Sequence, residues 1–177
     1  MRTFEVALEI PDPYVSLIGS IVVHWSYQER LLADLTYALL NVGPKHGRVA
    51  VRSPRAADQI AMIKQLMSLE KVECASIDLD KLAERLRALE NMRDLIAHSL
   101  WFVEPSTKLP AVQNLSGNWK PDPKSPKVAR RITPQAVIFD EKGLRSLINA
   151  MKKSIQETHK AHEEIVQKLL ALRENSL

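Results

Sequence analysis

The residues best suited to chemistry lie in one short segment, Arg93-Asp94-Leu95-Ile96-Ala97-His98. An arginine guanidinium offers a fixed, positively charged fork that binds phosphate, and a histidine imidazole exchanges a proton near neutral pH. Cleavage of RNA by its own 2′-hydroxyl needs both of these functions. The sequence therefore presents Arg93, Asp94 and His98 as candidate catalytic residues.

The spacing of these three residues sets the geometry of such a site. Asp94 and His98 are four residues apart, so in a helix they share one face and the carboxylate is placed to orient the imidazole. Arg93 and His98 are five residues apart, about 140° around a helix of 3.6 residues per turn. A second copy of the helix across a dimer interface would close that angle, so we expect a composite cleft that is partly open to solvent.

A purely structural role accounts for the same residues. Arg93 occupies one position in an otherwise apolar helix seam, and a buried charge is usually paired. Its partner is then Asp94, or Glu29 from the first predicted helix, and His98 is a helix-packing residue. The pattern alone leaves both interpretations open.

Four long helices are predicted, and the third carries the candidate residues. It begins at Asp78 or Asp80, and its seam repeats at alternating steps of three and four residues, which is typical of a helix that packs along its whole length. The seam positions are Leu79, Leu82, Leu86, Leu89, Arg93, Ile96, Leu100 and Val103. The Arg93 side chain is therefore directed at a protein interior, a helix interface or a cleft.

The first two helices have start and stop signals. The first is predicted over residues 13–42, between an Asp12-Pro13 start and a Gly43-Pro44 stop. The second is predicted to open at Ser53-Pro54, after a basic loop at residues 45–52.

A proline-rich insertion separates the third helix from the fourth. Residues 104–139 hold six of the ten prolines, which excludes a helix there, and short strands are predicted at residues 128–132 and 136–139. Asp140 is predicted to cap the fourth helix. The predicted fold is mainly all-α: a single domain over residues 1–177, built as an antiparallel four-helix bundle with a basic β/loop insertion.

The insertion also carries the net charge of the chain. Residues 104–135 contain six bases and two acids, and this excess equals the +4 of the whole sequence. A basic segment attracts phosphate, and a tryptophan within it is suited to stacking on a base, although a solvated loop would have the same composition. The residues of the insertion predicted to bind substrate are Trp119, Lys120, Lys124, Lys127, Arg130 and Arg131.

The composition limits the remaining possibilities. The chain has 177 residues, 45% of them hydrophobic and 26% charged, which is typical of one globular domain. The longest apolar run, residues 15–25, is too short to span a membrane, and we expect a cytoplasmic protein. Five scattered glycines exclude a glycine-rich phosphate loop. His159, His162 and Glu163 lack a further ligand, so no metal and no cofactor is expected.

The segment from Arg93 to His98, followed by Ser99-Leu100-Trp101, resembles the Arg-polar-…-His motif of HEPN-domain proteins. The resemblance implies a homodimer of antiparallel helical bundles in which Arg93, Asp94 and His98 line a cleft between two protomers. Trp25-Ser26-Tyr27-Gln28-Glu29 is similar to a Trp-and-Glu pattern of some HEPN-like families, which makes Glu29 a further candidate for substrate binding.

Two functions follow from the resemblance. The first is a metal-independent endoribonuclease of toxin or defence type, which leaves 2′,3′-cyclic phosphate and 5′-hydroxyl ends and whose partners are RNA and a cognate antitoxin. The alternative is a non-catalytic HEPN-like bundle that binds a protein partner or a nucleotide, with Arg93 as an interface ion.

Overall fold

The computed structural model describes residues 10–51, 55–103, 109–114, 121–122, 125–130 and 135–175, and this part of the chain is mainly helical. The helices are α1 (Asp12–Leu39), α2 (Pro44–Ala50), α3 (Ala56–Leu69), α4 (Leu79–His98) and α5 (Glu141–Glu174). The strands are β1 (Leu100–Val103), β2 (Pro110–Asn114), β3 (Pro121–Asp122), β4 (Ser125–Arg130) and β5 (Gln135–Ile138).

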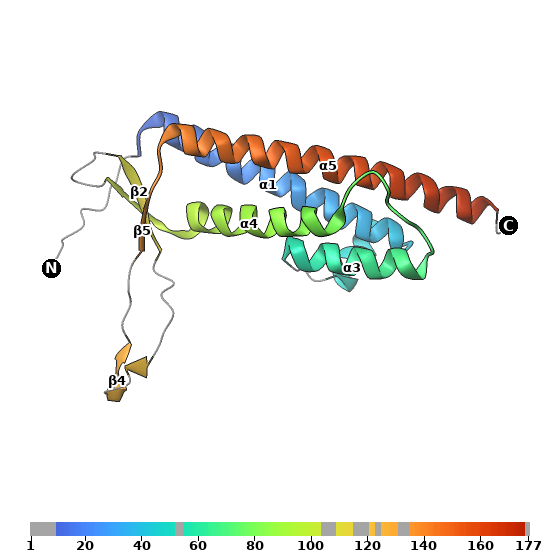
Figure 1. Cartoon of the computed structure of the whole chain (residues 1–177), viewed down its shortest axis with the longest axis horizontal. Coiled ribbons are helices and arrows are strands. Elements are labelled where there is room, and N and C mark those ends of the chain that lie inside the picture. The colour runs from blue at the N-terminus through green and yellow to red at the C-terminus, as the bar shows by residue number, and fades with distance from the viewer. Residues whose placement is uncertain are drawn as a thin grey trace.

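The two longest helices, α1 and α5, lie side by side along the length of the molecule (Figure 1). They run parallel, because Gln28 of α1 bonds Thr158 of α5 while Ala38, further along α1, bonds Arg173, further along α5. The predicted antiparallel order is therefore wrong for this pair. The direction in which a helix returns depends on the connections between helices, which the seam of each helix does not specify.

Helix α4 runs in the opposite direction to α3, as the prediction required. Ala56 at the start of α3 meets Glu90 late in α4, and Lys64 near the middle of α3 meets Asp80 at the start of α4. Helix α3 also packs on α1. The candidate segment of α4 thus lies beside the beginning of α3.

The predicted start and seam of α4 are confirmed up to Ile96. The Asp78 side chain accepts hydrogen bonds from the backbone of Asp80 and Lys81, and the leucines of the seam are buried. The prediction is wrong beyond His98, where the helix ends. Residues 100–103 form strand β1, because a Leu-Trp-Phe-Val run suits a strand that finds a pairing partner as well as it suits a helix.

The other helix ends differ from the prediction in detail. Asp140 caps α5 as predicted and accepts from the Gly143 amide. Asp12 is the first residue of α1 rather than its cap. The predicted basic loop at residues 45–52 is largely helix α2, and Gly47 of this helix lies against the Tyr37 ring, where a side chain would collide. The proposed Ser53-Pro54 start lies outside the described residues.

Residues 100–103 and the insertion form antiparallel sheet, in which strand β1 directly follows α4 and strand β5 directly precedes α5. Strand β2 pairs with β1 on one side and β5 on the other in a three-stranded sheet, and β3 pairs with β4 in a separate two-stranded sheet. The two predicted strands correspond to β4 and β5, whereas β1 and β2 were not predicted. Phe102 and Phe139 are buried where the three-stranded sheet meets the helices. This sheet therefore connects the C-terminal end of α4 to the N-terminal end of α5.

Candidate functional site

Arg93 points from α4 toward α1 and makes three contacts. Its Nη2 donates to Glu29 Oε1 at 3.0 Å, and its Nη1 lies 2.9 Å from Asp94 Oδ1. The guanidinium carbon lies 5.3 Å from the centroid of the Trp25 ring, within the range of a cation–π interaction. Only 19% of the Arg93 side chain is exposed. The guanidinium is therefore held between an aromatic face and two carboxylates.

Trp25 and Glu29 form the α1 side of this arrangement. They are four residues apart on the helix, and Trp25 Nε1 donates to Glu29 Oε1 at 2.7 Å, so one carboxylate oxygen accepts from both Trp25 and Arg93. Trp25 is buried, whereas the Glu29 side chain is 52% exposed. The tryptophan thus fixes the carboxylate that pairs with the arginine.

Two residues from the start of α3 and the middle of α4 extend the network. Arg55, which precedes α3, reaches Asp94 at 3.8 Å and donates to Asn91 Oδ1 at 3.1 Å. Glu90 is buried and accepts from the Ala56 amide at 3.4 Å, while its second oxygen has no hydrogen-bond partner. Desolvation raises the pKa of Glu90. The group that we call the Arg93 cluster consists of Trp25, Glu29, Arg55, Glu90, Arg93 and Asp94.

His98 lies outside this network. It is the last residue of α4, it is exposed, and it makes no hydrogen bond or ion pair in the described part of the chain. Asp94 shares its helix face, yet the Asp94 carboxylate pairs with Arg93 and Arg55 instead. Trp101 donates to the Ile96 carbonyl at 2.9 Å, and this bond secures the end of the helix next to His98.

The structure brings some predicted residues together and leaves others apart. Arg93, Asp94 and Glu29 are in contact, and Arg93 makes both of the ion pairs that its structural role predicted. His98 faces solvent on the next turn. Lys127 and Arg130 fall within β4, which is described by its backbone alone. The remaining predicted residues, Trp119, Lys120, Lys124 and Arg131, lie outside the described residues.

Sequence reasoning missed three members of the Arg93 cluster. It did not predict the contact of Trp25 with Arg93, although a seam tryptophan four residues before Glu29 was a usable signal. It also missed Arg55 and Glu90. Their contacts, Arg55 with Asn91 and Ala56 with Glu90, form where α3 packs on α4. These contacts join residues 36 and 34 positions apart, so no local sequence pattern predicts them.

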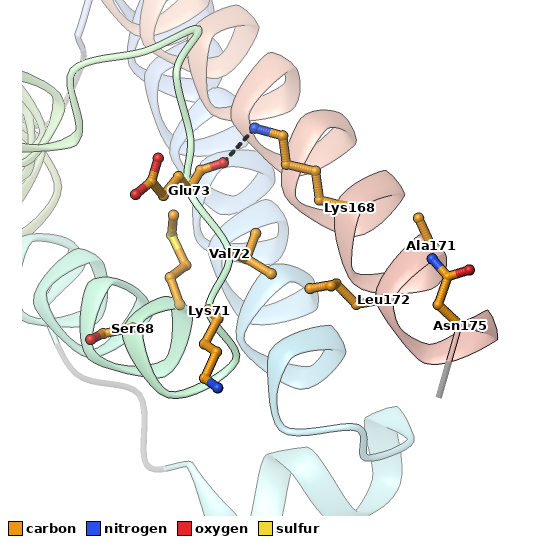
Figure 2. A pocket seen from close by; sticks show the side chains of 9 residues that line it. Ser68, Lys71, Val72, Glu73, Lys168, Ala171, Leu172 and Asn175 are labelled. Carbon is orange, nitrogen blue, oxygen red and sulfur yellow. Dashed lines mark hydrogen bonds between the residues drawn. The ribbon is translucent and has the colours of Figure 1, made fainter. Parts of the chain in front are cut away.

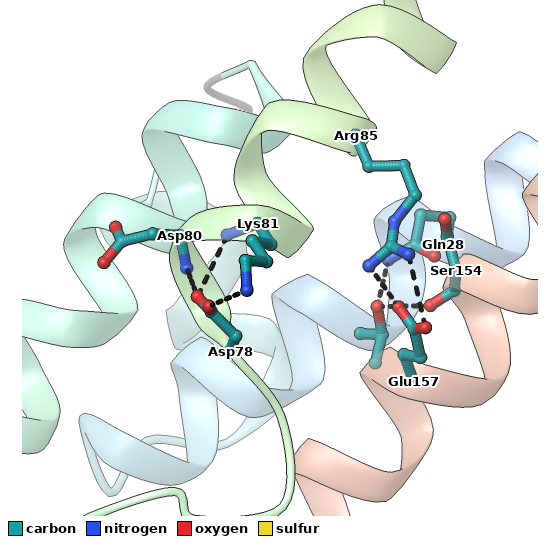
Figure 3. A network of polar contacts seen from close by, with 8 residues as sticks. Gln28, Asp78, Asp80, Lys81, Arg85, Ser154 and Glu157 are labelled. Carbon is teal, nitrogen blue, oxygen red and sulfur yellow. Dashed lines mark hydrogen bonds and ion pairs between the residues drawn. The ribbon is translucent and has the colours of Figure 1, made fainter.

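A second arginine of α4 pairs with a carboxylate away from the cluster. Figure 3 shows Arg85 pointing to Glu157 of α5, with Gln28 and Ser154 alongside. Arg85 and Arg93 are therefore similar in kind, since each is a partly buried arginine of α4 held by a carboxylate from another helix. Arg85 serves below as the matched control for Arg93.

Two pockets lie at the other end of the helices from His98. One of about 590 Å³ lies between the end of α3 and the end of α5, where Lys168 donates to the Glu73 carbonyl (Figure 2). The other, of about 320 Å³, lies between the end of α1 and α5. Neither is lined by a residue of the Arg93 cluster.

The residues considered for a metal site do not form one in the described part of the chain. His159 pairs with Glu163 at 3.5 Å, His162 is half-buried with a pKa lowered by desolvation, and no group of three potential ligands is gathered among the described residues. None of the described helices has the length and apolar character of a membrane span.

No family model, curated protein or solved structure matches this chain.

Proposed function

We propose that the chain is a HEPN-like bundle and a metal-independent endoribonuclease whose site lies at the C-terminal end of α4. One observation carries the proposal: an arginine in the apolar seam is oriented by Trp25 and two carboxylates, with an exposed histidine five residues later. An arginine held in this way is oriented to bind a phosphate, and an exposed histidine can exchange protons with a bound molecule.

In the proposed reaction His98 takes the proton of the 2′-hydroxyl while water protonates the departing 5′-oxygen, or His98 protonates the 5′-oxygen while water accepts the 2′-hydroxyl proton. Arg93 stabilises the negative charge that develops on the phosphorane, and Asp94 positions Arg93. The P–O5′ bond breaks as the 2′-oxygen bonds to phosphorus, which leaves a 2′,3′-cyclic phosphate and a 5′-hydroxyl.

Glu29 and Asp94 already place two negative charges on Arg93, so we expect a bound phosphate to displace one of them. Glu29 is the more exposed of the two, so it is the carboxylate we expect to be displaced. Trp25 would keep the guanidinium in place during this exchange. Arg55, with 60% of its side chain exposed, would supply a second positive charge beside the first.

The site is proposed to be shared by two protomers in the cytoplasm. Arg93 faces α1 while His98 faces solvent, so a single protomer does not direct both side chains at one phosphorus atom. A two-fold related copy would present its histidine to this arginine. A cognate antitoxin would act by covering the joint cleft.

The second candidate is a non-catalytic HEPN-like bundle that binds a protein partner or a nucleotide. The ion pairs of Arg93 with Glu29 and Asp94 favour this candidate, because they already neutralise the positive charge that would bind a phosphate. Arg93 would then be a structural ion between α1 and α4.

Analysis of RNA product ends separates the two candidates. The purified chain is incubated with single-stranded RNA in the presence of EDTA, and the fragments are tested for 2′,3′-cyclic phosphate. If the chain is a nuclease, RNA should be cleaved to these ends despite the EDTA. Expression of the chain in cells should then inhibit their growth, and Arg93→Ala should relieve the inhibition. Intact RNA would favour the binding module instead.

A further inference from the structure

The outward face of α1 carries no charge over four turns, which is unusual for an exposed helix. The exposed residues between positions 15 and 27 are Val15, Ser16, Gly19, Val22, Val23, Ser26 and Tyr27. We call them the α1 face. The four large apolar side chains among them are 52%, 40%, 67% and 51% exposed, in chain order. At 3.6 residues per turn the whole set falls within an arc of about 140°.

Helix α5 shows what an ordinary solvated face looks like in the same protein. Its exposed residues between positions 152 and 168 are Lys152, Lys153, Gln156, His159, Lys160, Glu163, Gln167 and Lys168. Single exposed apolar residues are normal on a protein surface, whereas a contiguous apolar patch indicates an interaction site. The contrast therefore indicates that the α1 face is an interaction site.

The α1 face is complementary to itself when two copies of the helix are antiparallel. The pairing that matches the charges at its two ends places Asp12 of one copy opposite Arg30 of the other. The same register places Gly19 opposite Val23, Ser16 opposite Ser26, and Val15 opposite Tyr27.

Each of these pairings has a physical reason. Asp12 and Arg30 are both exposed, and both lie along the centre of the arc that holds the α1 face. Arg30 bonds Asp34 of its own helix through Nε at 2.8 Å, so its terminal amino groups are the donors that would meet Asp12. Gly19 has open space around it, which lets a second helix approach closely and seat a valine there. The middle of the face is uncharged, so bringing two copies together buries no like charges.

We propose that the α1 face is the surface through which two copies of this chain form a two-fold symmetric dimer, with their α1 helices antiparallel. Asp12 and Arg30 pair at both ends of the contact, and the valines pack between them. The dimer surface is inferred from α1 alone, so it is testable whether or not the chain cleaves RNA.

The first experiment measures the mass of the full chain by light scattering at micromolar concentration. The wild type is expected to be a dimer. Val22→Glu is expected to raise the dimer dissociation constant by about 100-fold or more, because each copy would bury a carboxylate without a partner. Leu170→Glu is the matched control, since Leu170 is a 54% exposed apolar residue of α5, and it should leave the dimer unchanged. A monomeric wild type, or a dimer that Val22→Glu does not weaken, would overturn the proposal.

The second experiment tests the antiparallel register by disulfide formation in a Cys74→Ser background. Chains carrying Val15→Cys are mixed with chains carrying Tyr27→Cys, and the mixture is expected to cross-link on mild oxidation. Either variant alone should stay uncross-linked, because the two copies of position 15 would lie about 18 Å apart along the helix axis, at 1.5 Å per residue. A disulfide needs Cα atoms within about 7 Å. Cross-linking of either variant alone as readily as the mixture would contradict the register.

Discussion

Arg93 illustrates how far a single residue can be interpreted from the sequence. Its place in the seam predicted that the side chain faces a protein interior, a helix interface or a cleft, and it contacts α1 across a helix interface. Glu29 and Asp94 were both foreseen as partners, because a charge leaving water needs a counter-charge. The Trp25 ring beneath the guanidinium was not foreseen, since the rotation of α1 relative to α4 is a property of the packed fold.

Glu164 and Glu90 should change the stability of the fold in opposite directions as the pH falls, because their pKa values are shifted in opposite directions. Hydrogen bonds from Lys168, then from Ser76 and Ala75, lower the pKa of Glu164 below its usual value of 4.5. Its contribution to stability is therefore present above that pH and is lost as the pH falls below it. Glu164→Gln should lower the free energy of unfolding at neutral pH, and the difference from wild type should shrink in acid.

Glu90 should show the opposite sign. Desolvation raises its pKa above 4.5, so the folded state binds a proton more tightly than the unfolded state and gains stability as the pH falls. Glu90→Gln should raise the free energy of unfolding at neutral pH, with the gain disappearing as the pH approaches 4.5. Urea titrations of both variants across this pH range check the two signs, and parallel curves for the two would refute the assignment.

At the scale of elements, the sequence predicted helices better than it predicted their ends and directions. The seam of α4 up to Ile96 and the caps Asp78 and Asp140 were local signals, and these are confirmed. Strands β1 and β2 were missed because each is stabilised by pairing with the other, and the sequence of one strand does not identify its partner. Helix α2 was missed because its basic sequence lacks an apolar seam.

The α1–α5 contact contains a buried polar pair that should behave as a unit. Gln28 Nε2 donates to Thr158 Oγ1 at 2.8 Å, and both residues are almost fully buried. Thr158→Val should cost about 1–3 kcal/mol, because it leaves the Gln28 amide buried without its acceptor. The double variant with Gln28→Leu should recover most of that loss. A double-mutant cycle in urea measures the coupling, and strictly additive losses would contradict it.

At the scale of the whole molecule, the two ends of the helices differ in character. His98 ends α4 next to strand β1, while both described pockets are lined by residues near the C-terminal ends of α1, α3 and α5. Composition predicted that the insertion carries the charge excess. It did not predict that α1 and α5 run parallel, because direction depends on how the chain returns between helices rather than on any seam.

The basic insertion should set the salt dependence of RNA binding. Each lysine or arginine that contacts a phosphate releases bound counterions, so affinity falls as salt rises. Neutralising Lys120, Lys124, Lys127, Arg130 and Arg131 together should reduce the slope of log affinity against log salt by up to about 3.5 for single-stranded RNA, at about 0.7 per contact. Fluorescence anisotropy across a salt series provides the measurement. An unchanged slope would indicate that the insertion is a solvated segment that does not contact RNA.

The most direct test of the proposed function compares RNA cleavage by variants of α4 under single-turnover conditions with EDTA present. His98→Ala and Arg93→Ala should each lower the cleavage rate by about 100-fold or more, which is the usual effect of removing a proton-transferring or charge-stabilising group. Arg85→Ala, which also breaks an arginine–carboxylate pair of α4, should lower the stability of the fold while leaving cleavage within a few-fold of wild type. Circular dichroism confirms that each variant is folded. Equal rates in all four proteins, or no cleavage by the wild type, would contradict the assignment of Arg93 and His98 as catalytic residues.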